Sequence, residues 1–240
     1  MPHSVNILAF AAHPDDVELA CGGTIIKHAA LGQKVVIVDI TAGELGTRGN
    51  AKLRAEEAKK SAKILGLYTR ENLGLADGFF ELSEKNKLAV VKMIRHYKPK
   101  IVLANAVSDR HPDHARAAQL VSEACFLSGL IKVETTHAGK KQEAFRPEFV
   151  YHYIQDHYIK PDFIMDITGY FDLKMDAIKA YKSQFHDPKS KEPATPISSL
   201  EFIKILEARC REYGRLIKTE FAEGFTVERP VGIENFNDLI

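Results

Sequence analysis

The stretch that decides the fold of this 240-residue chain is Val5-Asn6-Ile7-Leu8-Ala9-Phe10-Ala11-Ala12-His13-Pro14-Asp15-Asp16. Its first eight residues are apolar apart from Asn6, which is typical of a strand that is buried on both faces of a sheet. The strand pattern stops at His-Pro-Asp-Asp, just before a segment with helical periodicity over residues 19–31. A second stretch has the same order, because the apolar run 100–106 leads to His111-Pro112-Asp113-His114 and a further helical segment.

The segments between these two stretches predict how they are arranged. Residues 34–41 form a β-branched, buried strand, and residues 71–75 form a short strand or edge segment. One helical pattern follows residue 50 and reaches to about residue 65. Another runs from Ser83, a predicted N-cap, to about residue 97. This alternation favours a parallel sheet with right-handed crossovers, whose carboxyl edge binds ligands in open α/β proteins. We therefore predict an α/β, single-domain, Rossmann-like layered fold with a mostly parallel sheet and helices on both faces.

The pattern becomes less regular after about residue 130. Residues 132–146 predict a loop, residues 149–154 and 162–167 predict strands, and residues 171–184 and 198–218 predict helices, as judged from their apolar spacing. No repeat or low-complexity tract divides the chain. We expect a single domain over residues 1–240, in which residues 1–130 form the Rossmann-like core. Residues 131–240 should complete the sheet and cover the active-site edge.

Composition limits the class of protein. The formal net charge is +1, which gives no reason to expect a nucleic-acid partner. No apolar stretch approaches the roughly 18–20 residues of a membrane span, and no signal-peptide pattern is present, so we expect a cytoplasmic protein without membrane contact. The three cysteines are far apart and none belongs to a CxxC pair, which argues against a disulfide framework.

The two polar turns hold residue types that bind a divalent ion such as zinc. Zinc accepts imidazole nitrogen and carboxylate oxygen, and a catalytic site has three protein ligands with one open position. His13 and Asp16 are three residues apart, as are His111 and His114. The alternative is that each turn is only a helix N-terminus with a capping carboxylate. Residues 21–24, Cys-Gly-Gly-Thr, weakly favour a nucleotide-binding turn, but neither a dinucleotide nor a P-loop motif is present.

Several motifs together resemble the LmbE-like family of zinc-dependent N-acetylglucosaminyl deacetylases. The family motifs are His13–Asp16, the Gly-rich loop 41–49, Leu53–Glu57 and His111–His114. The chain is most similar to the branch that removes acetyl from N-acetylglucosaminyl malate in bacillithiol biosynthesis. That narrower resemblance is carried by Asn72–Gly78, Asp109-Arg110, Lys160–Phe163 and Tyr181–Phe185. The loop 186–196 departs from the family pattern, so the resemblance gives no prediction about substrate contacts there.

The resemblance implies a role for each residue of the two turns. The metal ligands are His13, Asp16 and His114, which bind one Zn²⁺ per chain, with Fe²⁺ or Mn²⁺ as alternatives. Asp15 is the general base. His111 is a second catalytic residue that stabilises the oxyanion and protonates the leaving amine, with Asp113 supporting its charged form.

Two arginines are predicted to bind the substrate, because guanidinium groups suit carboxylates and malate carries two of them. They are Arg54, at the start of a helix, and Arg110, directly before the second turn. The expected partner is a small-molecule amino-sugar substrate, and a homo-oligomer is left open. The alternatives are a deacetylase of another N-acetyl amino sugar, such as a chitin disaccharide or an inositol-linked glucosamine, and a non-catalytic metal- or nucleotide-binding module.

Overall fold

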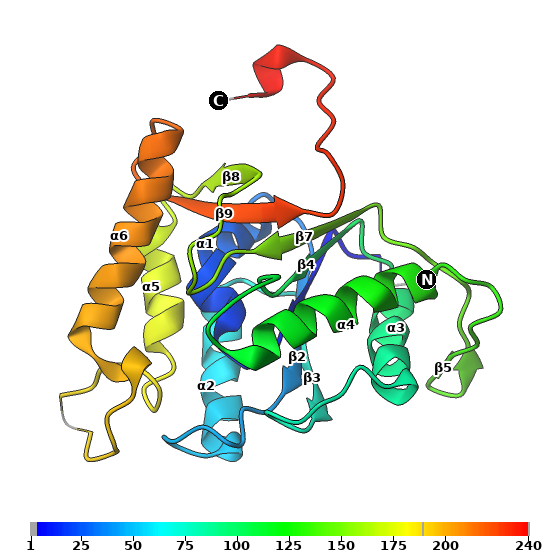
Figure 1. Ribbon diagram of the computed structural model, residues 1–240, viewed down its shortest axis with the longest axis horizontal. Helices are drawn as coiled ribbons and strands as arrows, with labels where there is room; N and C mark the ends of the chain where they lie inside the picture. Colours follow the sequence, from blue (N-terminus) through cyan, green and yellow to red (C-terminus); the bar gives the residue numbers. More distant parts are fainter. Residues whose placement is uncertain (1–3, 189, 240) are drawn as a thin grey trace.

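A seven-stranded sheet runs through the centre of the computed structural model, which describes residues 4–188 and 190–239 (Figure 1). In spatial order its strands are β3 (Thr69–Leu75), β2 (Val35–Thr41), β1 (Ile7–Ala11), β4 (Ile101–Ala104), β7 (Phe149–Tyr153), β9 (Ala222–Val227) and β8 (Phe163–Asp166). The first five strands are parallel, and β9 is antiparallel to both of its neighbours. The mostly parallel sheet is therefore confirmed. The predicted domain limits also take in residues 1–3, 189 and 240, which lie outside the described residues.

Helices cover both faces of this sheet, as predicted. They are α1 (Asp16–Ala30), α2 (Ala51–Ile64), α3 (Glu84–Tyr97), α4 (Pro112–Ser128), α5 (Phe171–Lys179) and α6 (Leu200–Leu216). Alternate residues of β1 point to opposite faces: Leu8 and Phe10 pack in one core with α3 and α4, while Ile7 and Ala9 pack in the other with α1 and α5. Burial on both sides explains why β1 and β2 read as continuous apolar runs.

Short-range signals place several helix ends. The side chain of Ser83 accepts a hydrogen bond from the backbone N–H of Asn86, which confirms the predicted N-cap of α3. Asn50 caps α2 in the same way. Each cap satisfies one of the backbone N–H groups that a helix leaves unpaired at its start.

The carboxyl-terminal third differs from the prediction at one strand. The sequence predicts no strand over β9, because Glu223 and Gly224 interrupt its apolar pattern. The Glu223 carboxylate is nevertheless buried, since Lys174 binds it at 2.6 Å and the backbone N–H of Thr24 donates to it at 2.7 Å. A buried charge needs such partners, and here α1 and α5 supply them.

Three smaller differences lie in the chain after residue 130. Helix α5 ends at Lys179 rather than at Gln184, because Ser183 is drawn to the Glu57 carboxylate of α2. Helix α6 starts at Leu200, after a short 3₁₀ helix over Pro196–Ser198. The expected loop 132–146 contains a two-stranded hairpin, β5 (Thr136–His137) and β6 (Lys140–Lys141). A second 3₁₀ helix spans Phe236–Asp238.

The topology brings the two polar turns together. Strands β1 and β4 are neighbours, with Ile7 opposite Ile101, so the turns that follow them leave the sheet at the same carboxyl edge. This is the position at which open α/β sheets bind ligands. None of the helices formed by residues 4–188 and 190–239 combines the length and the apolar composition of a membrane span.

Candidate metal centre and active site

The first polar turn has an unusual backbone. After β1 the chain passes through His13 and Pro14 to Asp15, whose φ of 121° lies in a region that L-residues rarely adopt. Asp15 occupies the N-cap position of α1 but makes no capping hydrogen bond with its side chain. Its carboxylate is therefore free for other contacts, and α1 begins at Asp16.

The second polar turn is a regular helix start. His111 is the N-cap of α4, and its Nδ1 accepts a hydrogen bond from the backbone N–H of Asp113 at 3.2 Å. Pro112 occupies the first helical position, where its missing N–H costs nothing. His114 then lies in the first turn of the helix, on the side that faces the first motif.

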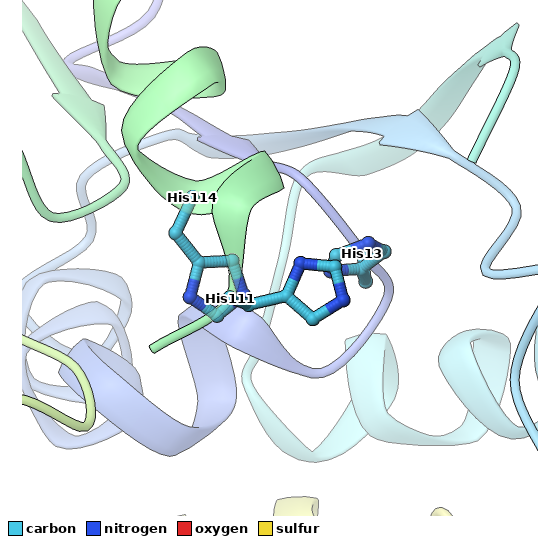
Figure 2. Close-up of side chains that lie close together, drawn as sticks. All are labelled: His13, His111 and His114. Atoms are coloured by element: carbon cyan, nitrogen blue, oxygen red, sulfur yellow. The ribbon is translucent and has the colours of Figure 1, made fainter. Parts of the chain in front are cut away.

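The three imidazoles of these turns converge, as Figure 2 shows for His13, His111 and His114. The ring centroids are 4.6 Å apart for His13 and His111 and 5.2 Å apart for His111 and His114. Asp16 lies between the turns, with one oxygen 3.6 Å from His13 Nδ1 and the other 3.1 Å from His114 Nε2. Both predicted ligand histidines thus meet the same carboxylate.

Further buried polar side chains hold this group in place. Asn105 and Gln155 donate hydrogen bonds to the Asp16 carboxylate at 3.0 and 3.1 Å. Asp77 lies 2.9 Å from His13 Nε2, and Asp109 contacts His114 Nδ1. None of these four residues was assigned a role from the sequence, although Asp77 follows β3 and Asp109 follows β4, where parallel strands place functional residues.

The surroundings of the imidazoles are strongly acidic. The Asp113 carboxylate lies 3.4 Å from His13 Nε2 and also accepts from the backbone N–H of Gly78. Burial alone would lower the pKa of His13, but its hydrogen bonds to Asp113, Asp16 and Asp77 raise that pKa well above the usual value. In the same way Asp16 and Asp109 raise the pKa of His114 to about 9, against the effect of burial.

The donor set therefore fits a divalent cation. Five carboxylates with side chains at most 7% exposed surround the site, namely Asp15, Asp16, Asp77, Asp109 and Asp113. Among the described residues, the arginines in contact with them are Arg54 and Arg116. Excess negative charge beside imidazole nitrogens favours a positive ion, and this mixture of nitrogen and oxygen donors suits zinc and related metals. Two groups of side chains have donor atoms close enough to share an ion: His13, His111 and His114 form one, and His13, Asp77 and Asp113 form the other.

Asp15 lies beside this centre, and its hydrogen bond goes to an arginine. Its carboxylate accepts a hydrogen bond from Arg54 Nη2 at 2.8 Å, and Arg54 also donates two bonds to the carbonyl oxygen of Pro14. Burial raises the pKa of Asp15 to about 7, although Arg54 opposes the shift. A carboxylate with a pKa near neutrality is suited to accept and return a proton.

His111 differs from the other two imidazoles. Burial, together with the nearby His13 and His114, lowers its pKa. The carboxylate of Asp113 points to His13, Gly78 and Arg116, so Asp113 reaches His111 through its backbone N–H. Because Nδ1 accepts that bond, the proton of the neutral ring resides on Nε2.

A cavity of about 320 Å³ opens onto these groups. Its lining includes the three imidazoles, Asp15, Asp16, Arg54 and Arg110, and residues 45–47 and 195–197 from two loops. The carboxyl-terminal part of the chain thus contributes one wall. Larger cavities of about 1020 and 420 Å³ contain none of the three imidazoles.

The two predicted substrate arginines have different surroundings. Arg54 is 8% exposed and is bound to the first polar turn, as described above. Arg110 is 49% exposed and lies at the rim, where its Nε is 2.9 Å from the Asp156 carboxylate. Both line the cavity, but only Arg110 is largely open to solvent.

Comparisons with known proteins identify the family of this chain. Residues 8–125 match the family model PIG-L, described as GlcNAc-PI de-N-acetylase. The chain is 31% identical over 192 residues to diacetylchitobiose deacetylase from Thermococcus kodakarensis, covering 75% of this chain and 70% of that protein. It is 25% identical to a probable N-acetyl-alpha-D-glucosaminyl L-malate deacetylase 2 from Bacillus anthracis, over 77% of this chain and 84% of that protein.

The fold also agrees with a crystal structure of the conserved protein TT1542 from Thermus thermophilus. The two structures superpose with a TM-score of 0.86 at 32% identity, over 97% of this chain and 98% of the other.

Proposed function

Because this chain belongs to the PIG-L and LmbE-like deacetylase family, we propose that it hydrolyses the acetamide of an N-acetylglucosamine conjugate. The observation that carries this proposal is the buried Asp15 carboxylate, which lies at an accessible cavity beside a cluster of imidazoles and further carboxylates. A purely structural zinc site is closed by four ligands and needs no free base.

His13, Asp16 and His114 are proposed to hold the metal, with one Zn²⁺ per chain and Fe²⁺ or Mn²⁺ as alternatives. Their donor atoms come from both polar turns, and Asp16 lies within 3.6 Å of both imidazoles. When bound, the metal supplies a Lewis acid that polarises the acetamide carbonyl and makes a water molecule more acidic.

The remaining residues of the turns handle the proton and the developing charge. Asp15 accepts a proton from the water whose oxygen attacks the carbonyl carbon, and it returns that proton to the nitrogen as the C–N bond breaks. The products are acetic acid and the amine, which exchange a proton to give acetate and the ammonium form. His111 donates a hydrogen bond from Nε2 to the carbonyl oxygen as negative charge develops there. Its neutral form follows from the bond that Nδ1 accepts from Asp113. In this proposal Asp15, and not His111, protonates the leaving amine.

The finer proposal is that the substrate is N-acetylglucosaminyl malate. The 25% identity to a probable deacetylase of that compound supports it, and so does Arg110 at the rim of the cavity. Arg110 contacts the partly exposed Asp156, which a substrate carboxylate could replace. The second candidate is a chitin disaccharide, which the 31% identity to a diacetylchitobiose deacetylase favours.

Acetate release from both compounds, with and without a chelator, tests the proposal. We expect turnover that the chelator abolishes, and turnover of the malate conjugate that exceeds that of diacetylchitobiose. Release from neither compound, nor from an inositol-linked N-acetylglucosamine, would favour a non-catalytic module.

Arg110→Ala separates the two candidate substrates. Loss of a charge-assisted bond is worth about 1.5–3 kcal/mol, or about 10- to 150-fold in kcat/KM for the malate conjugate. Diacetylchitobiose lacks carboxylates, so its kcat/KM should hardly change. Arg215→Ala, which removes an exposed arginine from the end of α6, is the matched control. An equal loss on both substrates would contradict the malate assignment.

A further inference from the structure

Each of the two proposed ligand imidazoles uses one nitrogen to face Asp16 and the other to bind a different carboxylate. His13 directs Nδ1 toward Asp16 and Nε2 toward Asp77. His114 directs Nε2 toward Asp16 and Nδ1 toward Asp109. Since Asp16 is common to both rings, the metal-facing atoms are Nδ1 of His13 and Nε2 of His114, and the other nitrogens are their outer atoms.

Asp109 is built to hold the outer nitrogen of His114. One oxygen of its fully buried carboxylate contacts His114 Nδ1. The other oxygen accepts hydrogen bonds from the backbone N–H groups of Asp156, at 3.1 Å, and His157, at 2.8 Å. The backbone beyond β7 therefore fixes the carboxylate, and the carboxylate fixes the ring.

Asp77 has the same arrangement at His13. Its Oδ1 lies 2.9 Å from His13 Nε2, and its Oδ2 accepts from the backbone N–H of Leu45 at 2.9 Å. Asp113 lies 3.4 Å from the same ring nitrogen, so His13 has a second carboxylate partner. Among the described residues, the outer nitrogen of His114 has one carboxylate partner, Asp109, whereas that of His13 has two.

We infer that Asp109, and to a smaller degree Asp77, are positioning residues that set the metal affinity by holding the outer imidazole nitrogens in their protonated form. This inference rests on the metal ligands proposed above. A carboxylate accepts the N–H of the outer nitrogen, which leaves the lone pair of the inner nitrogen facing Asp16 and available to a metal. Such partners commonly change metal affinity by 10- to 100-fold.

Asp109→Asn gives a sharp test because the amide has only one acceptor oxygen. The two backbone N–H groups of residues 156 and 157 select that oxygen, so the amide NH₂ faces His114 Nδ1. Nδ1 must then accept a hydrogen bond, which moves the ring proton to Nε2 and blocks the metal-facing atom. The side chain keeps its shape, and the buried partners stay satisfied.

The experiment measures Zn²⁺ affinity by competition with a fluorescent chelator, and thermal unfolding with and without Zn²⁺. We expect Asp109→Asn to bind Zn²⁺ about 10- to 100-fold more weakly, and Asp77→Asn to show a smaller loss. Unfolding of the metal-free protein should hardly change, whereas the stabilisation by Zn²⁺ should fall. Asp156→Asn is the matched control for affinity, because it removes a nearby negative charge without contacting His114.

The outcomes separate this inference from the proposed function. Parent-like Zn²⁺ affinity in Asp109→Asn would overturn the inference while leaving the metal site intact. An equal loss in Asp156→Asn would also overturn it, because charge alone would then explain the effect. If Asp109→Asn fails to fold, parent-like affinity in Asp77→Asn would count against the inference in the same way. A parent protein that binds no Zn²⁺ would remove the proposed metal site and the inference together.

Discussion

The two polar turns have almost the same sequence and very different construction. His13–Asp16 ends in the first residue of α1 and places Asp15 at a φ of 121°. His111–His114 starts with the N-cap of α4 and continues as regular helix. In the first turn the third residue, Asp15, forms an ion pair with Arg54. Its counterpart in the second turn, Asp113, contacts Gly78 and Arg116.

The contrast in backbone is consistent with the different roles proposed for the two turns. With this strained backbone the Asp15 carboxylate does not cap α1, and Asp15 lines the cavity instead. Strain of this kind persists only where the surroundings hold it, and here the two bonds from Arg54 to the Pro14 carbonyl do so. The relaxed second turn supplies imidazoles at helical spacing.

The largest expected effect comes from removing the residue that both turns share. Asp16→Ala should lose metal binding and reduce acetate release on the order of 10³-fold, because a metal contributes several kcal/mol to such a reaction. Metal content after desalting and acetate release check this result. Asp172→Ala, at an exposed position of α5, controls for loss of one charge. Full metal occupancy in Asp16→Ala would refute the ligand assignment.

The next effect separates the two equivalent aspartates. Asp15→Asn should retain the metal and lose about 10²- to 10³-fold in kcat, which lies within the usual range for a general acid or base. Asp113→Asn should lose less, because the proposed mechanism gives that carboxylate no proton to move. Steady-state kinetics together with metal analysis decide between them. A smaller loss in Asp15→Asn than in Asp113→Asn would reverse the roles of the turns.

Arg54 provides a test of how the first turn is held. We expect Arg54→Met to lower kcat about 10²-fold, since a misplacement of about 1 Å can have this effect, while KM changes little. The reason is that Arg54 bonds to Asp15 and Pro14. A rise in KM for the malate conjugate at unchanged kcat would instead support the substrate-binding role that the sequence suggested.

The smallest effect concerns stability. The difference in stability between the glycine and the alanine variant should have opposite signs at Asp15 and at Asp113. Glycine tolerates a positive φ, so Asp15→Gly should be more stable than Asp15→Ala by about 1 kcal/mol, or about 2–4 °C in Tm. Asp113 lies inside a helix, so Asp113→Gly should be less stable than Asp113→Ala by up to about 1 kcal/mol. Thermal unfolding of the four metal-free variants measures both differences. The same sign at both positions would show that backbone strain does not distinguish the turns.

Local patterns were sufficient for the part of the fold that carries the site. The buried strands β1, β2 and β4, the edge strand β3 and the N-cap Ser83 all follow from neighbouring residues, since burial pattern and capping act over a few positions. The convergence of His13, His111 and His114 could also be predicted, because parallel strands share one carboxyl edge.

Sequence patterns are therefore enough to predict the mostly parallel sheet, the edge at which the two turns meet and the residue types gathered there. The burial of Glu223 in a strand depends instead on tertiary contacts, because Lys174 and α1 come from distant parts of the chain. Tertiary contacts also place Asp77 and Asp109 on the outer nitrogens of the imidazoles. Such contacts depend on how separate elements pack together, so the local pattern of polar and apolar residues does not predict which charged side chains will form pairs.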